Sequence, residues 1–319
     1  MMLHKAIEGF FISRRADNIA DTTLAIYRHY LRLFAERIGD VEMDRIDADQ
    51  VVAFAAWLQT EYVPQRLNGD TAPLAASSLA NAWSAVRSLF GWAERRLNTG
   101  RPDRAWQRPR VQYVTVQPFS EEEMRRMLDA AQFTRPAATT RRTIFRMKRP
   151  MGKRDKAIVL LLLDTGIRAS ELCRLRVEDV DLNSGIATVR PHGTRQKTHG
   201  RAVFLSKRTI EAVWDYLASR TAHPADPVFI KTDGLVMDRM RLAHLVKRIG
   251  LRAGVEGAYP HRFRHTFAIQ YLRNGGDPFT LQRLLGHRDM DMVRRYLALA
   301  DDDAQRAHKT ASPVDRWRL

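Results

Sequence analysis

The segment TGIRASEL, at residues 165–172, decides how the rest of the sequence is interpreted. It places Arg168 directly after a glycine turn, at the expected start of a helix, with Glu171 three residues further along. Residues three apart share a helix face, so the carboxylate can hold the guanidinium in place. The planar fork of an arginine suits two oxygens of a phosphate. The segment therefore indicates a phosphate-binding arginine, although by itself it also fits an ordinary surface Arg–Glu pair.

A second cluster, HRFRH at residues 261–265, follows Pro260. A helix start attracts anions through its free N–H groups and its dipole, so His261 and Arg264 could converge on one phosphate. His261 and His265, at positions i and i+4, could instead bind a metal. That spacing lacks the glutamate of the zinc-protease motif, and no third ligand is evident. His265 could also be a packed core histidine.

A third motif, LLGH at residues 284–287, precedes a predicted helix that contains Tyr296. A turn between two short helices would bring His287 and Tyr296 to one site. Tyr296 directly follows Arg294 and Arg295, which suits contact with DNA. Taken alone, an aromatic residue on a short helix is usually part of the core, and His287 would be a structural turn residue.

The order of the motifs is more specific than any one of them. Arg168, His261, Arg264, His287 and Tyr296 follow the pattern T-G-hydrophobic-R-x-x-E-L, H-x-x-R-H, L-G-H and a tyrosine nine residues later. On these motifs the chain resembles the tyrosine recombinases, the family of phage integrases, Xer-type site-specific recombinases and Cre. The resemblance is close over residues 118–300 and looser over residues 1–108. It implies a mainly α protein, with a four-helix SAM-like core-binding domain and an α+β catalytic domain containing a small β-hairpin or sheet.

The hydrophobic patterns fit this division. Apolar residues recur at helical spacing in residues 1–108, the expected DNA-binding domain, where a four-helix module fits the pattern. Prolines and arginines interrupt residues 109–118, the expected linker. The expected catalytic domain spans residues 119–319 and begins with a capping-box sequence at Ser120. Within it we expect strands at 186–190 and 202–205 and helices at 156–163, 168–175, 206–220, 238–253, 261–273, 278–285 and 289–298.

The charge of the chain points to a polyanionic partner. The net charge is +17, and the sequence pI is about 10.6. Residues 1–108 hold 14 of the 53 basic and 13 of the 36 acidic residues, so almost all of the excess lies in the second half. Residues 135–156 carry nine Lys/Arg against one acid, Asp155, and we expect a charged loop that is either solvated or faces DNA. Nucleic acid is the favoured partner, with membrane surfaces and acidic proteins as alternatives.

Other features of the composition exclude several classes of protein. With no run of 18 or more apolar residues, a membrane-spanning helix is not expected. Residues 1–10 lack the apolar centre and cleavage site of a secretory signal. Cys173 is the single cysteine, so no internal disulfide can form. We therefore expect a cytoplasmic protein, associated with the nucleoid when it is on DNA.

The resemblance implies phosphoryl transfer without a metal, a nucleotide or any other cofactor. Tyr296 would be the nucleophile that forms a 3′-phosphotyrosine bond and releases a 5′-hydroxyl. The resemblance assigns stabilisation of the phosphate to Arg168, Arg264 and His287. His261 would act as the general base, and Glu171 would orient Arg168. A lysine in the hairpin loop would be the general acid; Lys197 is the candidate, and Arg195 or His199 could take part of that role.

The expected partner is double-stranded DNA with a specific target site. Contacts with it are expected from Arg141, Arg142, Arg146, Lys148, Arg149, Arg195, Arg294 and Arg295. The resemblance also implies a homo-oligomer, a tetramer on DNA, with accessory DNA-bending or directionality proteins and docking of residues 301–319 on a neighbouring protomer. Rival interpretations are a type IB topoisomerase, a DNA-binding regulator without catalysis, and a zinc protein using His261 and His265.

Overall fold

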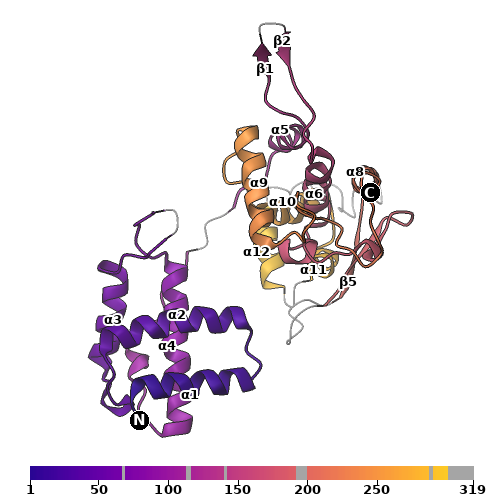
Figure 1. Cartoon of the computed structure of the whole chain (residues 1–319). Coiled ribbons are helices and arrows are strands. Elements are labelled where there is room, and N and C mark those ends of the chain that lie inside the picture. Colours follow the sequence, from indigo (N-terminus) through magenta and orange to yellow (C-terminus); the bar gives the residue numbers. More distant parts are fainter. Residues whose placement is uncertain (67–68, 113–115, 140–141, 192–199, 287–289, 301–319) are drawn as a thin grey trace, which may run out of the picture. The chain divides into compact units, whose positions relative to one another are not determined.

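The computed structural model describes residues 1–66, 69–112, 116–139, 142–191, 200–286 and 290–300 (Figure 1). These residues form two compact units, one within residues 1–112 and one from residue 116 onward. Each unit has a hydrophobic core of its own and hence the anatomy of a domain. In the described part of the chain, no helix combines the length and the apolar character needed to cross a membrane.

The first unit is built from α-helices. Its elements are α1 (Leu3–Ala16), α2 (Asp21–Ile38), η1 (Met43–Arg45), α3 (Ala48–Thr60), α4 (Ala76–Leu97) and η2 (Pro102–Ala105). At its centre Phe34 of α2 meets Phe54 of α3 and Phe90 of α4 edge to face, with ring centroids 5.0 and 6.1 Å apart. This arrangement of four α-helices in the described residues confirms the expected helical module.

The second unit combines α-helices with two small antiparallel sheets. Its helices are α5 (Glu121–Gln132), α6 (Gly152–Thr165), α7 (Ala169–Leu172), η3 (Val177–Asp179), α8 (Lys207–Leu217), α9 (Arg239–Ala253), α10 (Pro260–Arg273), α11 (Pro278–Leu285) and α12 (Asp291–Ala300). Strands β1 (Ala137–Thr139) and β2 (Arg142–Phe145) form a two-stranded ribbon, and β3 (Val180–Asp181), β4 (Ile186–Val189) and β5 (Arg201–Phe204) form a sheet in the order β3-β4-β5. The expected α+β architecture is confirmed.

Helix α6 lies at the centre of the second unit. It packs against α5, α8 and α10, and Ile158, Leu161 and Leu162 have no exposed surface. Because α6 is held on several sides, both of its ends have fixed positions. The glycine turn of the TGIRASEL segment follows one end, and the basic ribbon precedes the other.

A smaller core joins the last three helices. Ile269 of α10, Leu281 and Leu285 of α11, and Val293 and Tyr296 of α12 are almost fully buried against one another. Three helices therefore share one apolar centre, and the candidate nucleophile is part of it.

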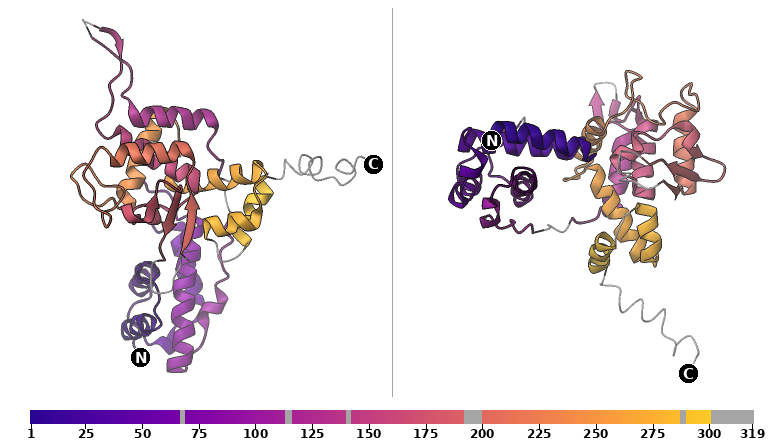
Figure 2. Two further views of the ribbon diagram at one scale, coloured as in Figure 1. Left: turned by 90° about the vertical axis from the view of Figure 1, so that its right-hand side faces the viewer. Right: turned by 90° about the horizontal axis from the view of Figure 1, so that it is seen from below.

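The structure differs from three expectations about elements. The basic stretch expected as a loop contains β1 and β2, since Thr143, Ile144 and Phe145 favour strands. Figures 1 and 2 show this ribbon projecting from the helices of its own unit. Helix α6 starts at Gly152, earlier than expected, and α7 ends at Leu172, earlier than residue 175. After α7 the backbone pairs with a distant segment instead, as in the 2.9 Å hydrogen bond from Val177 N–H to the Asp226 carbonyl.

Candidate active site

The glycine turn after α6 presents Arg168 at the start of α7. Gly166 ends α6 in the left-handed region (φ +58°), and a Cβ there would lie 2.5 Å from Cδ1 of Phe267. Glycine is therefore required both by the backbone and by the space. The Arg168 Nη1 donates to Glu171 Oε1 at 3.0 Å, and its backbone N–H donates to Oε2 at 2.9 Å. The Arg168 side chain is still 31% exposed, so it can meet a ligand.

Glu171 connects Arg168 to a second arginine, Arg201 of β5. The buried Glu171 carboxylate accepts two hydrogen bonds from Arg201, at 3.0 and 2.8 Å. Burial alone would raise the pKa of Glu171, but the hydrogen bonds and charges of Arg201 and Arg168 outweigh it and lower the pKa to about 2. The carboxylate is thus ionised throughout the physiological range. Sequence reasoning missed Arg201, because no local pattern links it to a carboxylate 30 residues away.

Arg264 of α10 lies close enough to Arg168 for their charges to interact, and it joins two helix ends. It is 2% exposed, and it donates from Nη1 to the Gly166 carbonyl at 2.9 Å and from Nη2 to the Leu285 carbonyl at 2.7 Å. Arg168 donates to the carbonyl of Gly286, at 3.4 Å. Burial and the positive charge of Arg168 lower the pKa of Arg264 to about 9, so it remains charged at neutral pH. The two predicted arginines therefore lie together.

Two histidines of α10 lie beside these arginines. The rings of His261 and His265 are 4.6 Å apart between centroids. His261 has an exposed side, yet desolvation by its packed surroundings and the charges of Arg264 and Arg168 lower its pKa. Burial, His261 and Arg264 lower the pKa of His265 to about 4. Both imidazoles are consequently neutral at pH 7, and a neutral imidazole can accept a proton.

Tyr296 of α12 is on the same side of α10 as the histidines. Its ring meets that of His265 edge to face, with centroids 5.5 Å apart. It is 2% exposed, because Leu285 and Val293 belong to the same small core. The structure thus brings Arg168, Arg264, His261 and Tyr296 into one region, with the tyrosine covered.

The other predicted active-site residues lie outside the described part of the chain. His287, Lys197 and Arg195 fall in the segments 287–289 and 192–199. His199 also falls in the second segment. Across the described residues, no group of three His, Cys, Asp or Glu side chains could hold a metal ion. Among these residues, the pair of His261 and His265 therefore has no third metal ligand.

The predicted DNA-contacting residues have varied surroundings. Arg146 donates to both carboxylate oxygens of Asp129, one of them at 3.0 Å. Lys148 is exposed, Arg149 is partly buried and Arg294 is exposed. Arg141 lies outside the described residues, and so do the side chains of Arg142 and Arg295.

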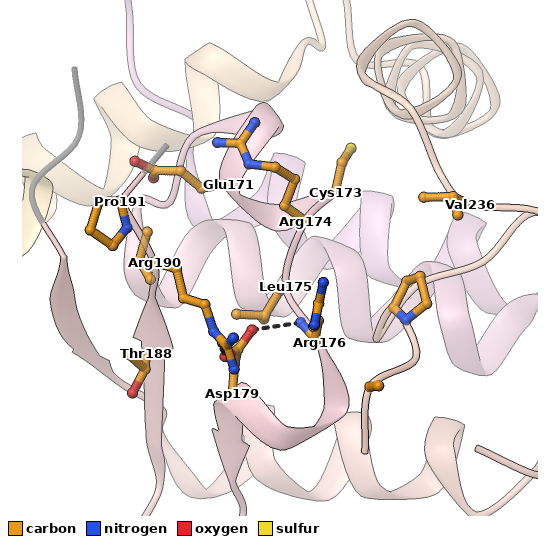
Figure 3. Close-up of a pocket in the computed structure, with 13 residues that line it drawn as sticks. Glu171, Cys173, Arg174, Leu175, Arg176, Asp179, Thr188, Arg190, Pro191 and Val236 are labelled. Carbon is orange, nitrogen blue, oxygen red and sulfur yellow. Dashed lines mark hydrogen bonds and ion pairs between the residues drawn. The ribbon is translucent and has the colours of Figure 1, made fainter. Parts of the chain in front are cut away.

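Glu171 also lines a cavity of about 380 Å³, together with residues that follow α7 and β4 (Figure 3). Three arginines line it, and none of them was predicted: Arg174, Arg176 and Arg190. Arg190 is neutralised by Asp179, to which its Nε donates at 2.5 Å. The Arg174 guanidinium, in contrast, forms no hydrogen bond with a described residue, and partial burial lowers its pKa. The cavity therefore extends the positive character of the site beyond Arg168.

Comparison with known proteins agrees with this arrangement. Residues 119–303 match the profile of the phage integrase family, and residues 10–97 match the SAM-like N-terminal domain of phage integrases. The chain belongs to the phage integrase family. The enzyme class expected from the motifs, a tyrosine site-specific recombinase, is confirmed by this family match and by the relatives that follow.

Relatives of this integrase-family chain include named tyrosine recombinases. Tyrosine recombinase XerA of Thermococcus kodakarensis is 28% identical over 318 residues, which covers 98% of this chain and 97% of XerA. Tyrosine recombinase XerD of Neisseria meningitidis serogroup B is 28% identical over 306 residues, 94% of each chain. The Tn1549 transposon integrase in complex with transposon right end DNA shares the fold, with a TM-score of 0.71 at 20% identity over the full length of both chains.

Proposed function

We propose that this protein is a site-specific recombinase or integrase that cuts duplex DNA and rejoins it through a covalent bond to Tyr296. The observation that carries the proposal is the convergence of Arg168, Arg264 and Tyr296 from three different helices. Two neutral histidines lie beside them: His265 against the Tyr296 ring, and His261 near both arginines. A fixed pair of positive charges next to a tyrosine suits phosphoryl transfer, which depends on positioning and electrostatic stabilisation.

The bonds balance without an external energy source. The Tyr296 hydroxyl oxygen attacks the scissile phosphorus, the P–O5′ bond breaks, and the 5′-oxygen takes a proton. A second DNA 5′-hydroxyl then attacks the phosphotyrosine, and the P–O bond to Tyr296 breaks. Since one phosphoester replaces another in each step, the reaction uses no ATP. In this proposal the arginines, and not a metal ion, supply the positive charge.

The arginines supply the charge that the transition state needs. Negative charge builds up on the non-bridging oxygens, and the positions of Arg168 and Arg264 are fixed before the substrate arrives. Glu171 and Arg201 position Arg168 without touching the phosphate. His287 is proposed to add a hydrogen bond to a phosphate oxygen.

Proton transfer is assigned to two other side chains. A tyrosine hydroxyl has a pKa of about 10, so it needs a base to attack at neutral pH. His261 is proposed for this role, since its lowered pKa keeps it unprotonated. Lys197 is proposed to protonate the leaving 5′-oxygen.

Burial of Tyr296 adds a conformational step. Its side chain is 2% exposed in the small core of α10, α11 and α12. A phosphate can reach the hydroxyl only after α12 shifts, so we propose that DNA binding or assembly drives this shift.

The proposed substrate is double-stranded DNA with a specific site, bound by both domains. The Tn1549 integrase, which shares the fold, was determined with transposon end DNA. Assembly as a tetramer, accessory proteins and docking of residues 301–319 on a neighbouring protomer belong to the same proposal. So do the DNA contacts of Arg294, Arg295 and the basic residues 141–149.

The decisive experiment traps the covalent intermediate. The protein is mixed with nicked duplexes from its own genetic neighbourhood, and adducts are resolved on a denaturing gel. Tyr296→Phe should abolish the adduct. Tyr271→Phe, a matched control on α10 packed against the same small core, should retain it.

The alternatives give different results. An adduct that survives Tyr296→Phe would place the nucleophile elsewhere. Specific DNA binding with no adduct from the wild-type protein would indicate a regulator without catalysis. Relaxation of supercoiled DNA with no recombinant product would indicate a topoisomerase.

A further inference from the structure

Arg135 and Arg146 of the basic segment 135–156 help to line a second positive site, away from the tyrosine. A cavity of about 220 Å³ lies where the ends of α5 and α9 meet the base of the β1–β2 ribbon. Four arginines line it: Arg126, Arg135, Arg146 and Arg252. The proposed chemistry leaves all but Arg146 without a role.

Positive charge in this cavity exceeds negative charge. Among the described residues that line it, the one acid is Asp129, and Arg146 already binds both of its oxygens. Within that lining, three guanidinium groups thus remain without a carboxylate. Partial burial lowers the pKa of Arg252. The charges of Arg149, Arg248 and Arg135 lower this pKa further, and the charge of Asp155, which does not line the cavity, opposes them.

Several hydrogen-bond donors at this place are unused. A guanidinium has five N–H groups. Arg252 donates from Nε to the Ala130 carbonyl at 3.3 Å, but its buried Nη2 has no partner among the described residues. Nε of Arg149, beside the same helix end, is also buried without a described partner. Arg135 uses one of its N–H groups to donate to the Leu251 carbonyl, at 3.1 Å. Buried donors without acceptors are rare, so an anion that reached Arg252 would satisfy a donor that the described residues leave unpaired.

The base of the ribbon is firmly held. Thr134 N–H donates to the Met147 carbonyl at 2.9 Å, and Met147 N–H donates to Thr134 Oγ1 at 3.0 Å. Arg149 N–H donates to the Gln132 carbonyl at 2.7 Å. The cavity is therefore lined by backbone that hydrogen bonds hold in place. Figure 2 shows the ribbon projecting from the helices of its own unit. A two-stranded ribbon is marginally stable by itself, and a partner along it would add stability.

Helix α6 separates this cavity from the active site. Arg149 lies just before its first residue, Gly152, and the active-site Gly166 follows its last. Fourteen helical residues span about 21 Å. That length corresponds to about six steps of 3.4 Å along a DNA strand.

We propose that the cavity lined by Arg126, Arg135 and Arg252 holds a backbone phosphate of the bound duplex, several base pairs from the scissile phosphate. The inference rests on the proposed function in that DNA is the substrate. Free inorganic phosphate has the same chemistry, but DNA is favoured, because it is the proposed substrate and because the exposed Lys148 adds a positive charge at the base of the same ribbon.

The test measures salt-dependent binding of the full chain to a random-sequence duplex by fluorescence anisotropy. Arg126→Ala/Arg135→Ala should weaken binding about tenfold and reduce the slope of log K against log salt by about one. Arg125→Ala/Arg273→Ala removes the same charge outside the cavity and should leave the slope unchanged. Arg125 is a matched control, since it adjoins Arg126 on α5 and pairs with Glu121 at 2.5 Å.

Two further variants keep the test independent of folding and of catalysis. Arg126→Lys/Arg135→Lys keeps the charge and should restore the slope. An alanine variant with the control's slope would overturn the proposal. Thermal unfolding with and without inorganic phosphate identifies the other source: if phosphate stabilises the wild type but not the alanine variant, while DNA binding is the same for both, the cavity binds free phosphate and the proposal is wrong. Binding needs no cleavage, so Tyr296→Phe can serve as the background, and a failure of the proposed chemistry would leave this result standing.

Discussion

Single residues with several partners hold the site together. Glu171 is the clearest case, because one buried carboxylate positions both Arg168 and Arg201. The sequence predicted the link from Glu171 to Arg168, since residues three apart meet on a helix. It could not predict Arg201, which β5 brings in from another part of the chain.

The lowered pKa of Glu171 makes a prediction about acid stability. A carboxyl whose folded pKa is about 2, below the ordinary value of 4.5, contributes stability above that ordinary value and loses it as the pH falls. We expect the wild-type protein to lose roughly 3 kcal/mol more than Glu171→Gln between about pH 5 and pH 2. Urea unfolding across this range measures the difference.

The matched control is Glu178→Gln, whose arginine partners are exposed. Exposed ion pairs contribute little, so its acid profile should follow the wild type. Equal acid slopes for wild type and Glu171→Gln would contradict the role given to this carboxylate.

At the scale of elements, the C-terminal ends of helices build the site. The carbonyls of Gly166 and Leu285, at the ends of α6 and α11, hold Arg264 from both sides. Caps and periodicity made most helices predictable, for example Ser120 at the start of α5. The β1–β2 ribbon was not predictable, because its charge run suggested a loop, either solvated or facing DNA, and the pairing of its two strands leaves no signal in that charge pattern.

Replacing Gly166 tests this construction. Gly166→Ala combines a positive φ with a contact of 2.5 Å to Phe267, so we expect a loss of about 2–5 kcal/mol and weak cleavage. Thermal or urea unfolding gives the first quantity.

Gly254→Ala is the control. Gly254 also ends a helix at positive φ (+63°), but no described atom lies within 4 Å of the point where a Cβ would stand, so the loss should be about 1–2 kcal/mol. Equal losses for both variants would mean that close packing at Gly166 is unimportant.

At the scale of the whole molecule, charge governs the encounter with DNA. The net charge is +17, and residues 109–319 hold 39 of the 53 basic residues. Each phosphate contact releases counterions, so DNA affinity should fall steeply with salt, by roughly a thousandfold between about 50 and 200 mM. Anisotropy titrations over this range measure the slope, and a flat response would contradict charge-driven binding.

The burial of Tyr296 in the small core has a consequence for cleavage at sites other than the target. On the proposed mechanism, the side chain whose hydroxyl attacks DNA also packs in the core shared by three helices. The unbound protein must therefore lose part of this packing before Tyr296 can react. Stray duplexes that bind weakly cannot supply that free energy. Fidelity then depends on the rigidity of this core, and a mutation that loosens it would be expected to increase accidental nicking.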